Sequence, residues 1–220
     1  MNGAQWLIRT LKDRGVEQLF VLCGNGLPPL LDACLDFRMK IVDVRNEQAA
    51  AFMADLYGRL TKRLGVCVVS SGPGHTNALT GLANAWWDGG PMLLISGQST
   101  NTTRGMDHFQ ELPQVEMAAP VCKYASRVLN VRSLVADVGN AVAACTSGRP
   151  GPSHLTISAD VLSAEVPEDL TWRRERRPAE VVQRALGDPN LVREAATLLA
   201  AAKRPVAVVG SGAFYADAAG

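Results

Sequence analysis

One stretch decides the fold: Lys40-Ile41-Val42-Asp43-Val44-Arg45-Asn46-Glu47-Gln48-Ala49-Ala50-Ala51-Phe52. A short apolar run passes directly into a helical pattern, which predicts a strand over 40–44 and a helix over 46–62. Glu47 lies at the junction. Because open α/β folds bind ligands at the carboxyl ends of their strands, Glu47 is a candidate functional residue. The alternative is a first-turn acid that only complements the helix dipole, worth about 0.3–1 kcal/mol.

The same alternation of short apolar runs and amphipathic runs continues along the chain. It predicts an α/β fold, a doubly wound and mainly parallel sheet with helices on both faces. The expected strands cover 18–23, 40–44, 65–70, 91–96 and 153–158, and the expected helices cover 3–14, 28–37, 46–62, 74–87 and 132–145.

A change of composition marks a second domain. The segment 166–190 is rich in Pro, Arg and Glu without apolar periodicity, which is typical of a linker. A helix over 191–202 and a strand over 205–209 are predicted beyond it. We therefore expect a domain at 1–165, a linker at 166–189 and the truncated start of a second α/β domain at 190–220. Because folds below about 40 residues rarely build their own core, we expect a piece of a longer enzyme.

Composition limits the function classes. The 220 residues are 20% charged and 47% hydrophobic with net charge +1, which is typical of a globular protein without a nucleic-acid partner. The basic cluster 173–177 is interpreted as solvated linker rather than a binding patch. Five cysteines without a CxxC pair favour reduced thiols in a cytoplasmic protein over a disulfide framework or a metal site. We expect neither a signal peptide nor a membrane span.

Two glycine-rich loops follow predicted strands. In the loop 24–29, Pro29 replaces the third glycine of the dinucleotide fingerprint, and no GK[ST] motif occurs. What remains is a turn in which Gly24 and Gly26 would let a flat group approach the backbone.

The second loop, 70–77, contains serine but no GxSxG elbow. The histidines at 75, 108 and 154 are scattered along the chain, so a serine hydrolase is disfavoured. For His75, a structural role at a helix start is favoured over catalysis.

Eight motifs stand in a specific order between Gly15 and about Asp160. They are Gly24-Asn25-Gly26, Arg45-Asn46-Glu47-Gln48-Ala49-Ala50, Tyr57-Gly58-Arg59, Ser71-Gly72-Pro73-Gly74 with Asn77, Gly81-Leu82-Ala83-Asn84-Ala85, Gly97-Gln98, Phe109-Gln110-Glu111 and Ser147-Gly148-Arg149-Pro150-Gly151-Pro152. In this order they resemble the pyrimidine-binding domain of thiamine-diphosphate enzymes, the group of acetolactate synthase, benzoylformate decarboxylase and 2-hydroxyacyl-CoA lyase. Most members of that family have histidine where this chain has Asn46.

The resemblance implies a catalytic role for Glu47. In this family the glutamate shares a proton with N1′ of the cofactor's aminopyrimidine, which favours the tautomer whose 4′ nitrogen can take the proton from C2 of the thiazolium ring. Such sharing requires an apolar setting with no strong cation alongside. We therefore expect Arg45 to point away from Glu47, toward Asp43 or another chain.

The resemblance assigns the remaining site residues one by one. It implies an active-site glutamine at Gln110 beside the substrate-proximal Phe109. Ser70, also near the substrate, stands where some decarboxylating relatives carry a histidine, which favours carboligation or C–C cleavage. The expected cofactor-binding residues, besides Glu47, are Gly24, Asn25, Gly26, Pro73 and Asn77.

The diphosphate half of the cofactor needs further protein. The family grips it through magnesium with a Gly-Asp-Gly stretch, which this chain lacks. We therefore expect Mg²⁺ to be bound by another domain or subunit, and the chain alone to be inactive. The resemblance also allows FAD as a second cofactor. It implies a homodimer or tetramer through the helices containing 47–57 and 81–87.

Two classes of function stay open. One is the pyrimidine-binding part of an acetolactate-synthase-like enzyme that makes or breaks C–C bonds of 2-keto acids, with 2-hydroxyacyl-CoA lyase or 2-keto acid decarboxylase as alternatives. The segment 109–114 fits synthases and lyases alike, so the substrate is a 2-keto acid or an acyl-CoA derivative. The other class is an inert fragment that keeps the fold without the chemistry.

Overall fold

The computed structural model describes residues 1–171 and 186–218. The chain divides into two compact units, Met1–Val181 and Val182–Gly220. Most of the predicted linker, including the basic cluster 173–177, lies outside the described residues.

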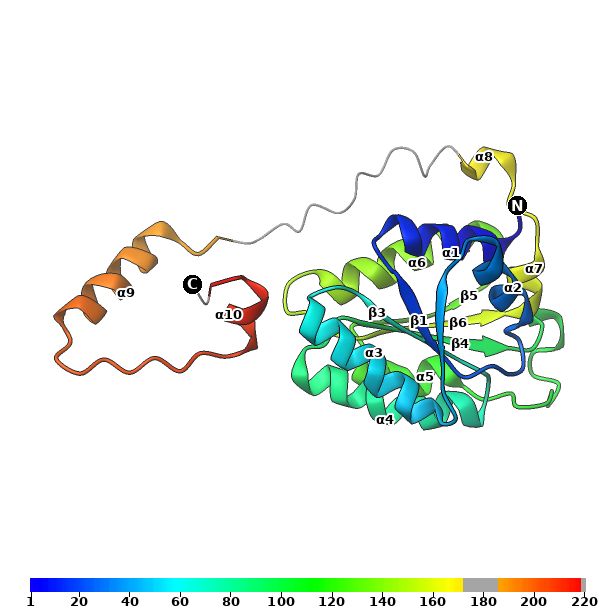
Figure 1. The fold of residues 1–220 in the computed structure, drawn as a ribbon, viewed down its shortest axis with the longest axis horizontal. Coiled ribbons are helices and arrows are strands. Elements are labelled where there is room, and N and C mark those ends of the chain that lie inside the picture. The colour runs from blue at the N-terminus through cyan, green and yellow to red at the C-terminus, as the bar shows by residue number, and fades with distance from the viewer. Residues whose placement is uncertain (172–185, 219–220) are drawn as a thin grey trace. The chain divides into compact units, whose positions relative to one another are not determined.

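The first unit is built on a six-stranded sheet in which every pairing is parallel (Figure 1). Its order is β2-β1-β3-β4-β6-β5, so the predicted doubly wound α/β fold is confirmed. The central strands β3 and β4 are buried along their whole length, as expected for a parallel sheet covered on both faces. The strands are β1 (Gln18–Val21), β2 (Lys40–Asp43), β3 (Gly65–Val69), β4 (Met92–Gln98), β5 (Tyr124–Val128) and β6 (Ser153–Ser158).

Helices cover both faces of this sheet. Figure 1 shows α1 (Gly3–Asp13), α2 (Pro28–Asp36) and α6 (Val131–Thr146) on one face, and α3 (Glu47–Thr61), α4 (Pro73–Asp88) and α5 (Gln114–Ala118) on the other. Each face has its own buried apolar cluster. The shorter elements are η1 (Asn101–Thr103), η2 (Ala119–Val121), α7 (Ala159–Ser163) and α8 (Glu168–Thr171).

The two helices that carry Glu47 and Asn77 pack very closely. A Cβ added at Gly81 of α4 would lie 2.5 Å from the Cβ of Ala51 on α3, so only glycine permits this approach. The close packing fixes the first turns of α3 and α4 relative to each other.

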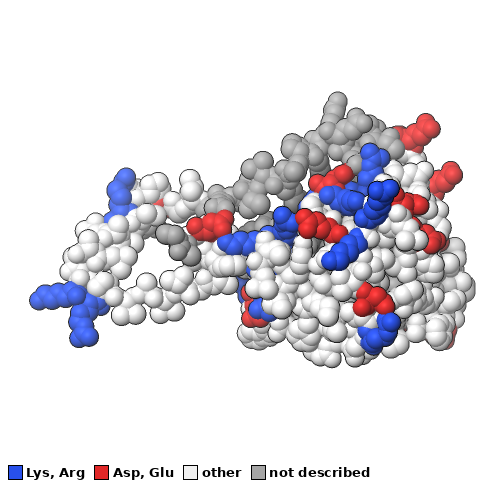
Figure 2. Space-filling view, in the orientation of Figure 1, with Lys and Arg blue, Asp and Glu red and all other residues white. Residues whose placement is uncertain are grey.

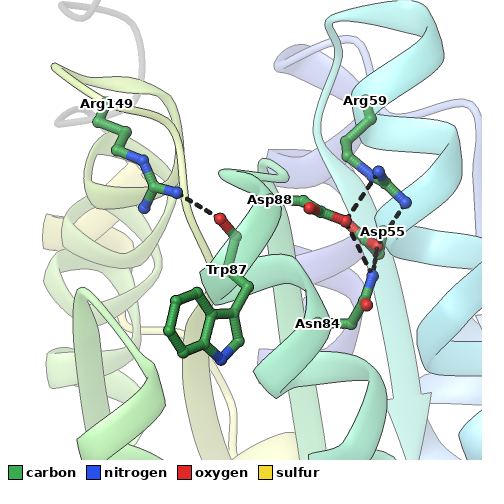
Figure 3. Close-up of polar contacts among 6 residues, drawn as sticks. All are labelled: Asp55, Arg59, Asn84, Trp87, Asp88 and Arg149. Carbon is green, nitrogen blue, oxygen red and sulfur yellow. Dashed lines mark hydrogen bonds and ion pairs between the residues drawn. The ribbon is translucent and has the colours of Figure 1, made fainter. Parts of the chain in front are cut away.

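A polar cluster ties the far ends of the same two helices together (Figure 3). Asp55 is fully buried and accepts hydrogen bonds from Asn84 at 2.8 Å and from Arg59 at 3.1 Å. Arg59 also pairs with Asp88 of α4 at 2.9 Å. Because burying a carboxylate is unfavourable without such partners, the cluster holds α3 and α4 in one arrangement.

Arg149 provides hydrogen-bond donors for the last carbonyl groups of α4. Its guanidinium donates to the carbonyl oxygens of Trp86 at 3.0 Å and Trp87 at 2.6 Å, and Figure 3 shows it reaching Trp87. The last carbonyls of a helix have no partner within the helix, and a cation there also complements the helix dipole.

The second unit contains α9 (Pro189–Ala201) and α10 (Ser211–Tyr215), so the predicted helix is confirmed within two residues at its start. The predicted strand over 205–209 is wrong, because these residues form no regular element. A strand needs a neighbour to pair its backbone N–H and C=O groups, and the described part of this unit offers none. Leu191, Leu198 and Leu199 of α9 are all more than half exposed.

The surface carries charges of both signs. On the face shown in Figure 2, basic and acidic side chains are interspersed rather than gathered into one patch. Within residues 1–171 and 186–218, no helix is long and apolar enough to cross a membrane.

Candidate functional site

The candidate site lies at the carboxyl ends of β1, β3 and β4. Three segments meet there, namely 22–27 after β1, 70–74 after β3 and 99–113 after β4. The first turn of α3 adds Glu47 to the same edge. Parallel strands bring their carboxyl ends to one edge of the sheet, which explains how residues far apart in sequence come together.

Glu47 and Asn77 are in direct contact. The side-chain Nδ2 of Asn77 donates to Oε2 of Glu47 at 2.9 Å, and Glu47 is half-buried. Asn46 caps α3, because its Oδ1 accepts the backbone N–H of Gln48 at 2.8 Å. The asparagine that replaces the usual histidine therefore has a local structural role.

Arg45 pairs with Asp43, as predicted. Its guanidinium donates to the Asp43 carboxylate and to the Val44 carbonyl, and both charged side chains are exposed. The hydrogen bond to Asp43 raises the pKa of Arg45. The cation two residues from Glu47 is thus held by another carboxylate.

The Ser70 side chain packs between two glycines of the site. A Cβ at Gly24 would lie 2.6 Å from the Ser70 Cβ, and one at Gly74 would lie 2.4 Å from the Ser70 Oγ. The same Gly74 position is 3.4 Å from Oε1 of Glu47. Gly24 and Gly74 therefore both pack against the Ser70 side chain, and Gly74 lies directly beside the Glu47 carboxylate.

The glycines of the first loop have internal packing reasons. A Cβ at Gly26 would lie 2.7 Å from the backbone N and O of Gln98, and Gly26 has φ +82°. The Ser70 side chain occupies the space where a Cβ of residue 24 would lie. Close packing within the protein thus accounts for both glycines, and their contact with a bound ring stays a prediction.

The second part of the site centres on Ser71. Its hydroxyl donates to Oε1 of Gln110 at 3.2 Å and accepts from Nδ2 of Asn25 at 3.4 Å. Asn25 also reaches Ser99 Oγ at 3.5 Å, and Ser99 donates to the Phe109 carbonyl at 3.4 Å. The structure therefore links Asn25, Gln110 and Phe109.

Gln110 has a strained backbone. Its φ of +62° is rare for a residue with a side chain and raises the energy by roughly 1–2 kcal/mol. Gly72 packs against it so tightly that an added Cβ would lie 2.9 Å from the Gln110 Cβ. Such strain clusters at functional sites, which supports a role for Gln110. The Phe109 side chain is 70% exposed.

Sequence reasoning missed Gln114, the first residue of α5. This fully buried amide accepts the Gly72 N–H at 2.9 Å and donates to the Gly97 carbonyl at 3.3 Å and to Thr156 Oγ1 at 3.2 Å. It thereby joins the loop after β3 to β4 and β6. No motif indicated this role, since only the fold reveals that a polar residue is buried here.

His75 has the structural role that was favoured for it. The ring is buried, with Nδ1 2.8 Å from Ser96 Oγ and its centroid 4.7 Å from that of His154. Burial lowers the pKa of His75 to about 4. Burial also lowers the pKa of His154 well below its ordinary value, with smaller contributions from the neighbouring His75 and Arg127. Both rings are therefore neutral at pH 7.

The geometry suits one half of the expected cofactor. Glu47 offers a carboxylate that a neutral amide holds, with Gly74 directly beside it. This donor set fits the N1′ side of an aminopyrimidine. In the part of the chain that the structure describes, no three His, Cys, Asp or Glu side chains are placed to hold a metal ion.

Comparison with known proteins identifies the domain. Residues 1–117 match the family model described as "Thiamine pyrophosphate enzyme, N-terminal TPP binding domain". Over 218 residues, 99% of this chain, it is 34% identical to human 2-hydroxyacyl-CoA lyase 1, covering 37% of that protein. Over 217 residues, 98% of this chain, it is 35% identical to the large subunit of acetolactate synthase isozyme 3 from Escherichia coli K12, covering 38% of it.

A third relative matches a shorter stretch. Over 161 residues, 73% of this chain, the sequence is 39% identical to 2-hydroxyacyl-CoA lyase 2 from Caenorhabditis elegans, covering 25% of that protein. The chain thus spans between about a quarter and two fifths of the length of these relatives.

Proposed function

Because the chain belongs to the thiamine pyrophosphate enzymes and carries their N-terminal TPP-binding domain, we propose that it forms the pyrimidine-binding part of an acetolactate-synthase-like enzyme. Such an enzyme makes or breaks C–C bonds of 2-keto acids. When bound, thiamine diphosphate supplies an acidic carbon and an electron sink, and the protein supplies orientation and proton transfer.

The contact between Glu47 and Asn77 carries the proposal. Asn77 satisfies Oε2 of Glu47 at 2.9 Å, so we assign proton exchange with N1′ of the pyrimidine to Oε1. The pairing of Arg45 with Asp43 leaves Glu47 without a competing cation from its own loop. Gln110, held by Ser71, is assigned to the substrate side of the site, with Phe109 and Ser70 beside it.

The diphosphate and its magnesium ion are assigned to another domain or subunit. Magnesium sites combine carboxylate and phosphate oxygens, and among the described residues no group of three His, Cys, Asp or Glu side chains is placed to hold a metal ion. FAD as a second cofactor stays a prediction, because no described contact bears on it.

An apolar surface on α3 supports assembly of the chain into a homodimer or tetramer. Phe52, Met53, Leu56 and Leu60 follow one another at helical spacing and are all exposed, and Trp87 at the end of α4 is 81% exposed. Contiguous apolar surface of this kind is typical of protein–protein contacts. These residues lie in the helices predicted to form the dimer.

Sedimentation velocity tests this assembly. We expect Leu56→Glu to shift the chain toward monomer, whereas Leu35→Glu, a change at a more exposed leucine on α2 of the opposite face, should leave assembly unchanged. A wild-type chain that sediments as a monomer at about 100 μM, a concentration well above a micromolar Kd, would argue against this contact surface.

Two alternatives remain beside the synthase. The similarity to 2-hydroxyacyl-CoA lyases supports C–C cleavage of an acyl-CoA derivative, and the segment 109–114 fits both classes. A 2-keto acid decarboxylase is less favoured because Ser70 provides no relay histidine. An inert fragment without the diphosphate-binding domain is the further alternative.

One experiment separates these alternatives. The chain is titrated calorimetrically with thiamine diphosphate and Mg²⁺, alone and with a polypeptide that carries the diphosphate-binding part of a relative. We expect binding only in the mixture, and we expect turnover to be abolished by Glu47→Gln but not by Glu17→Gln on the surface. Turnover of pyruvate would support the synthase and turnover of a 2-hydroxyacyl-CoA the lyase. Neither binding nor turnover under any pairing would support the inert fragment.

A further inference from the structure

A second hollow opens beyond the Phe109–Gln110 turn. It has a volume of about 240 Å³ and is lined by Arg104, Glu111, Leu112, Pro113, Glu116 and Arg127. It lies where β4 and β5 end, at the carboxyl edge where open α/β sheets bind ligands. None of these six residues contributes a hydrogen bond to the Glu47–Asn77 pair.

Arg127, which lines this hollow, is held by a neutral group. It pairs in register with Thr156 of β6, and its Nη1 donates to Oε1 of Gln98, the last residue of β4. Gln98 is only 3% exposed, so this amide is a fixed support. Burial and the cation of Arg104 lower the pKa of Arg127.

The neighbouring carboxylates do not neutralise the two arginines directly. Glu111 uses both oxygens on its own loop, accepting the N–H of Gly105 at 2.8 Å and that of His108 at 3.4 Å. Within the described ranges, neither Arg104 nor Arg127 forms an ion pair, and Glu116 lies at the exposed rim. A partly buried guanidinium with donors to spare favours an anionic partner.

We propose that this pocket binds the carboxylate of a small monoanion through Arg127 and Arg104, and that the anion is a 2-keto acid. The presence of an anion site follows from the two guanidinium groups, whereas the choice of a 2-keto acid rests on the proposed function. Two glutamates share the lining with the two arginines, so Glu111 and Glu116 repel a polyphosphate more strongly than a monoanion. The adjoining Gln110 turn places the pocket beside the site assigned to the substrate.

Side-chain ¹⁵N NMR on the 220-residue chain tests the proposal without any thiamine diphosphate, so the result does not depend on the cofactor site. The chain is titrated with pyruvate, inorganic phosphate and coenzyme A in parallel. We expect saturable shifts of the Arg127 Nε and Gln98 Nε2 signals with pyruvate, and weaker or no shifts with phosphate and coenzyme A.

Variants decide the role of each group. Arg127→Gln should weaken pyruvate binding by about tenfold or more, the usual effect of losing a charge-assisted hydrogen bond. Arg127→Lys should bind with intermediate affinity, and Glu116→Gln, a rim change that leaves buried groups intact, should bind pyruvate more tightly. Arg132→Gln, an exposed arginine on α6, is the matched control.

Three results would overturn the proposal: unchanged affinity in both Arg127→Gln and Glu116→Gln, shifts confined to other residues, or tighter binding of coenzyme A or phosphate than of pyruvate. If pyruvate binds here while the complete enzyme turns over no 2-keto acid, the anion site stands and the proposed function falls.

Discussion

The side-chain amide of Asn77 donates to Oε2 of Glu47 at 2.9 Å and thereby ties the amino-terminal part of α4 to the first turn of α3. The two helices are also held at their far ends by the buried carboxylate of Asp55. The candidate catalytic acid is thus fixed by a rigid helix pair rather than by a loop.

Replacing Asn77 tests the neutral character of this contact. Asn77→Ala should lower the free energy of unfolding by less than about 1 kcal/mol, because the bond is exposed. Asn77→Asp should be more destabilising, since it places a second carboxylate against Glu47. Urea unfolding in low and high salt measures both, with Thr80→Ala on the same helix as control. If added salt does not reduce the Asn77→Asp effect, charge repulsion is not its cause.

Gln114→Leu should destabilise the first unit strongly. The change removes the three hydrogen bonds of the Gln114 amide to the Gly72 N–H, the Gly97 carbonyl and Thr156 Oγ1 in the interior. Thr156 Oγ1 retains its contact with His154 Nε2. Each buried polar group that loses its partner costs about 1–3 kcal/mol. We therefore expect urea unfolding to show a free energy of unfolding lower by about 2 kcal/mol or more. Gln48→Leu on α3 is the control. A loss no greater than the control's would mean that Gln114 does not fix the loop.

Arg59→Ala should expose the dependence of Asp55 on its partner. The free energy of unfolding should fall by about 2–3 kcal/mol. This is somewhat less than for a fully buried ion pair, because the Arg59 side chain is 32% exposed. Arg63→Ala removes an ion pair with Glu17 in which both side chains are more than half exposed, so it should change stability little. Equal effects of the two variants would contradict the account of the buried cluster.

The buried histidines predict acid sensitivity. Burial lowers the pKa of His75 from 6.5 to about 4, so the unfolded chain binds more protons than the folded chain between these values. Stability is therefore complete above about pH 6.5 and falls as the pH drops toward 4, by up to about 1.4 kcal/mol per pH unit from this group. His154, also buried and close to Arg127, acts in the same direction.

Urea unfolding between pH 4 and pH 7.5 measures this slope. His154→Gln should reduce it relative to wild type, whereas His108→Gln, an exposed change, should not. Identical slopes in His75→Gln and in His154→Gln would assign the acid sensitivity to carboxylates instead.

The sequence predicted the elements with strong apolar periodicity. Five of the six strands and the helices beside them match within about two residues, the usual uncertainty of element ends. β5 was missed because Tyr124-Ala125-Ser126-Arg127-Val128 is an edge strand whose residues are mostly half-buried, so it lacks an apolar run. The strand over 205–209 was wrongly predicted because local propensity cannot supply a partner strand.

The sequence predicted those features of the candidate site that depend on a single residue's place in its own segment. The strand-to-helix junction indicated Glu47. The requirement that no cation lie beside Glu47 predicted that Arg45 points away from it, and Arg45 pairs with Asp43. The Gln114 bridge and the Arg127–Gln98 contact depend on which strands neighbour each other, since β5 pairs with β6 and β6 with β4. Such contacts follow from sheet order, which periodicity does not specify.

Hydrogen–deuterium exchange at C2 of thiamine diphosphate bound to the complete enzyme, measured for wild type and Glu47→Gln, tests the role of Glu47 most directly. Because glutamine keeps the size of the side chain but cannot exchange a proton, the account predicts exchange slowed by roughly 10²–10⁴-fold with cofactor still bound. Exchange at the wild-type rate in Glu47→Gln would contradict the assignment of Glu47 as the residue that activates the cofactor.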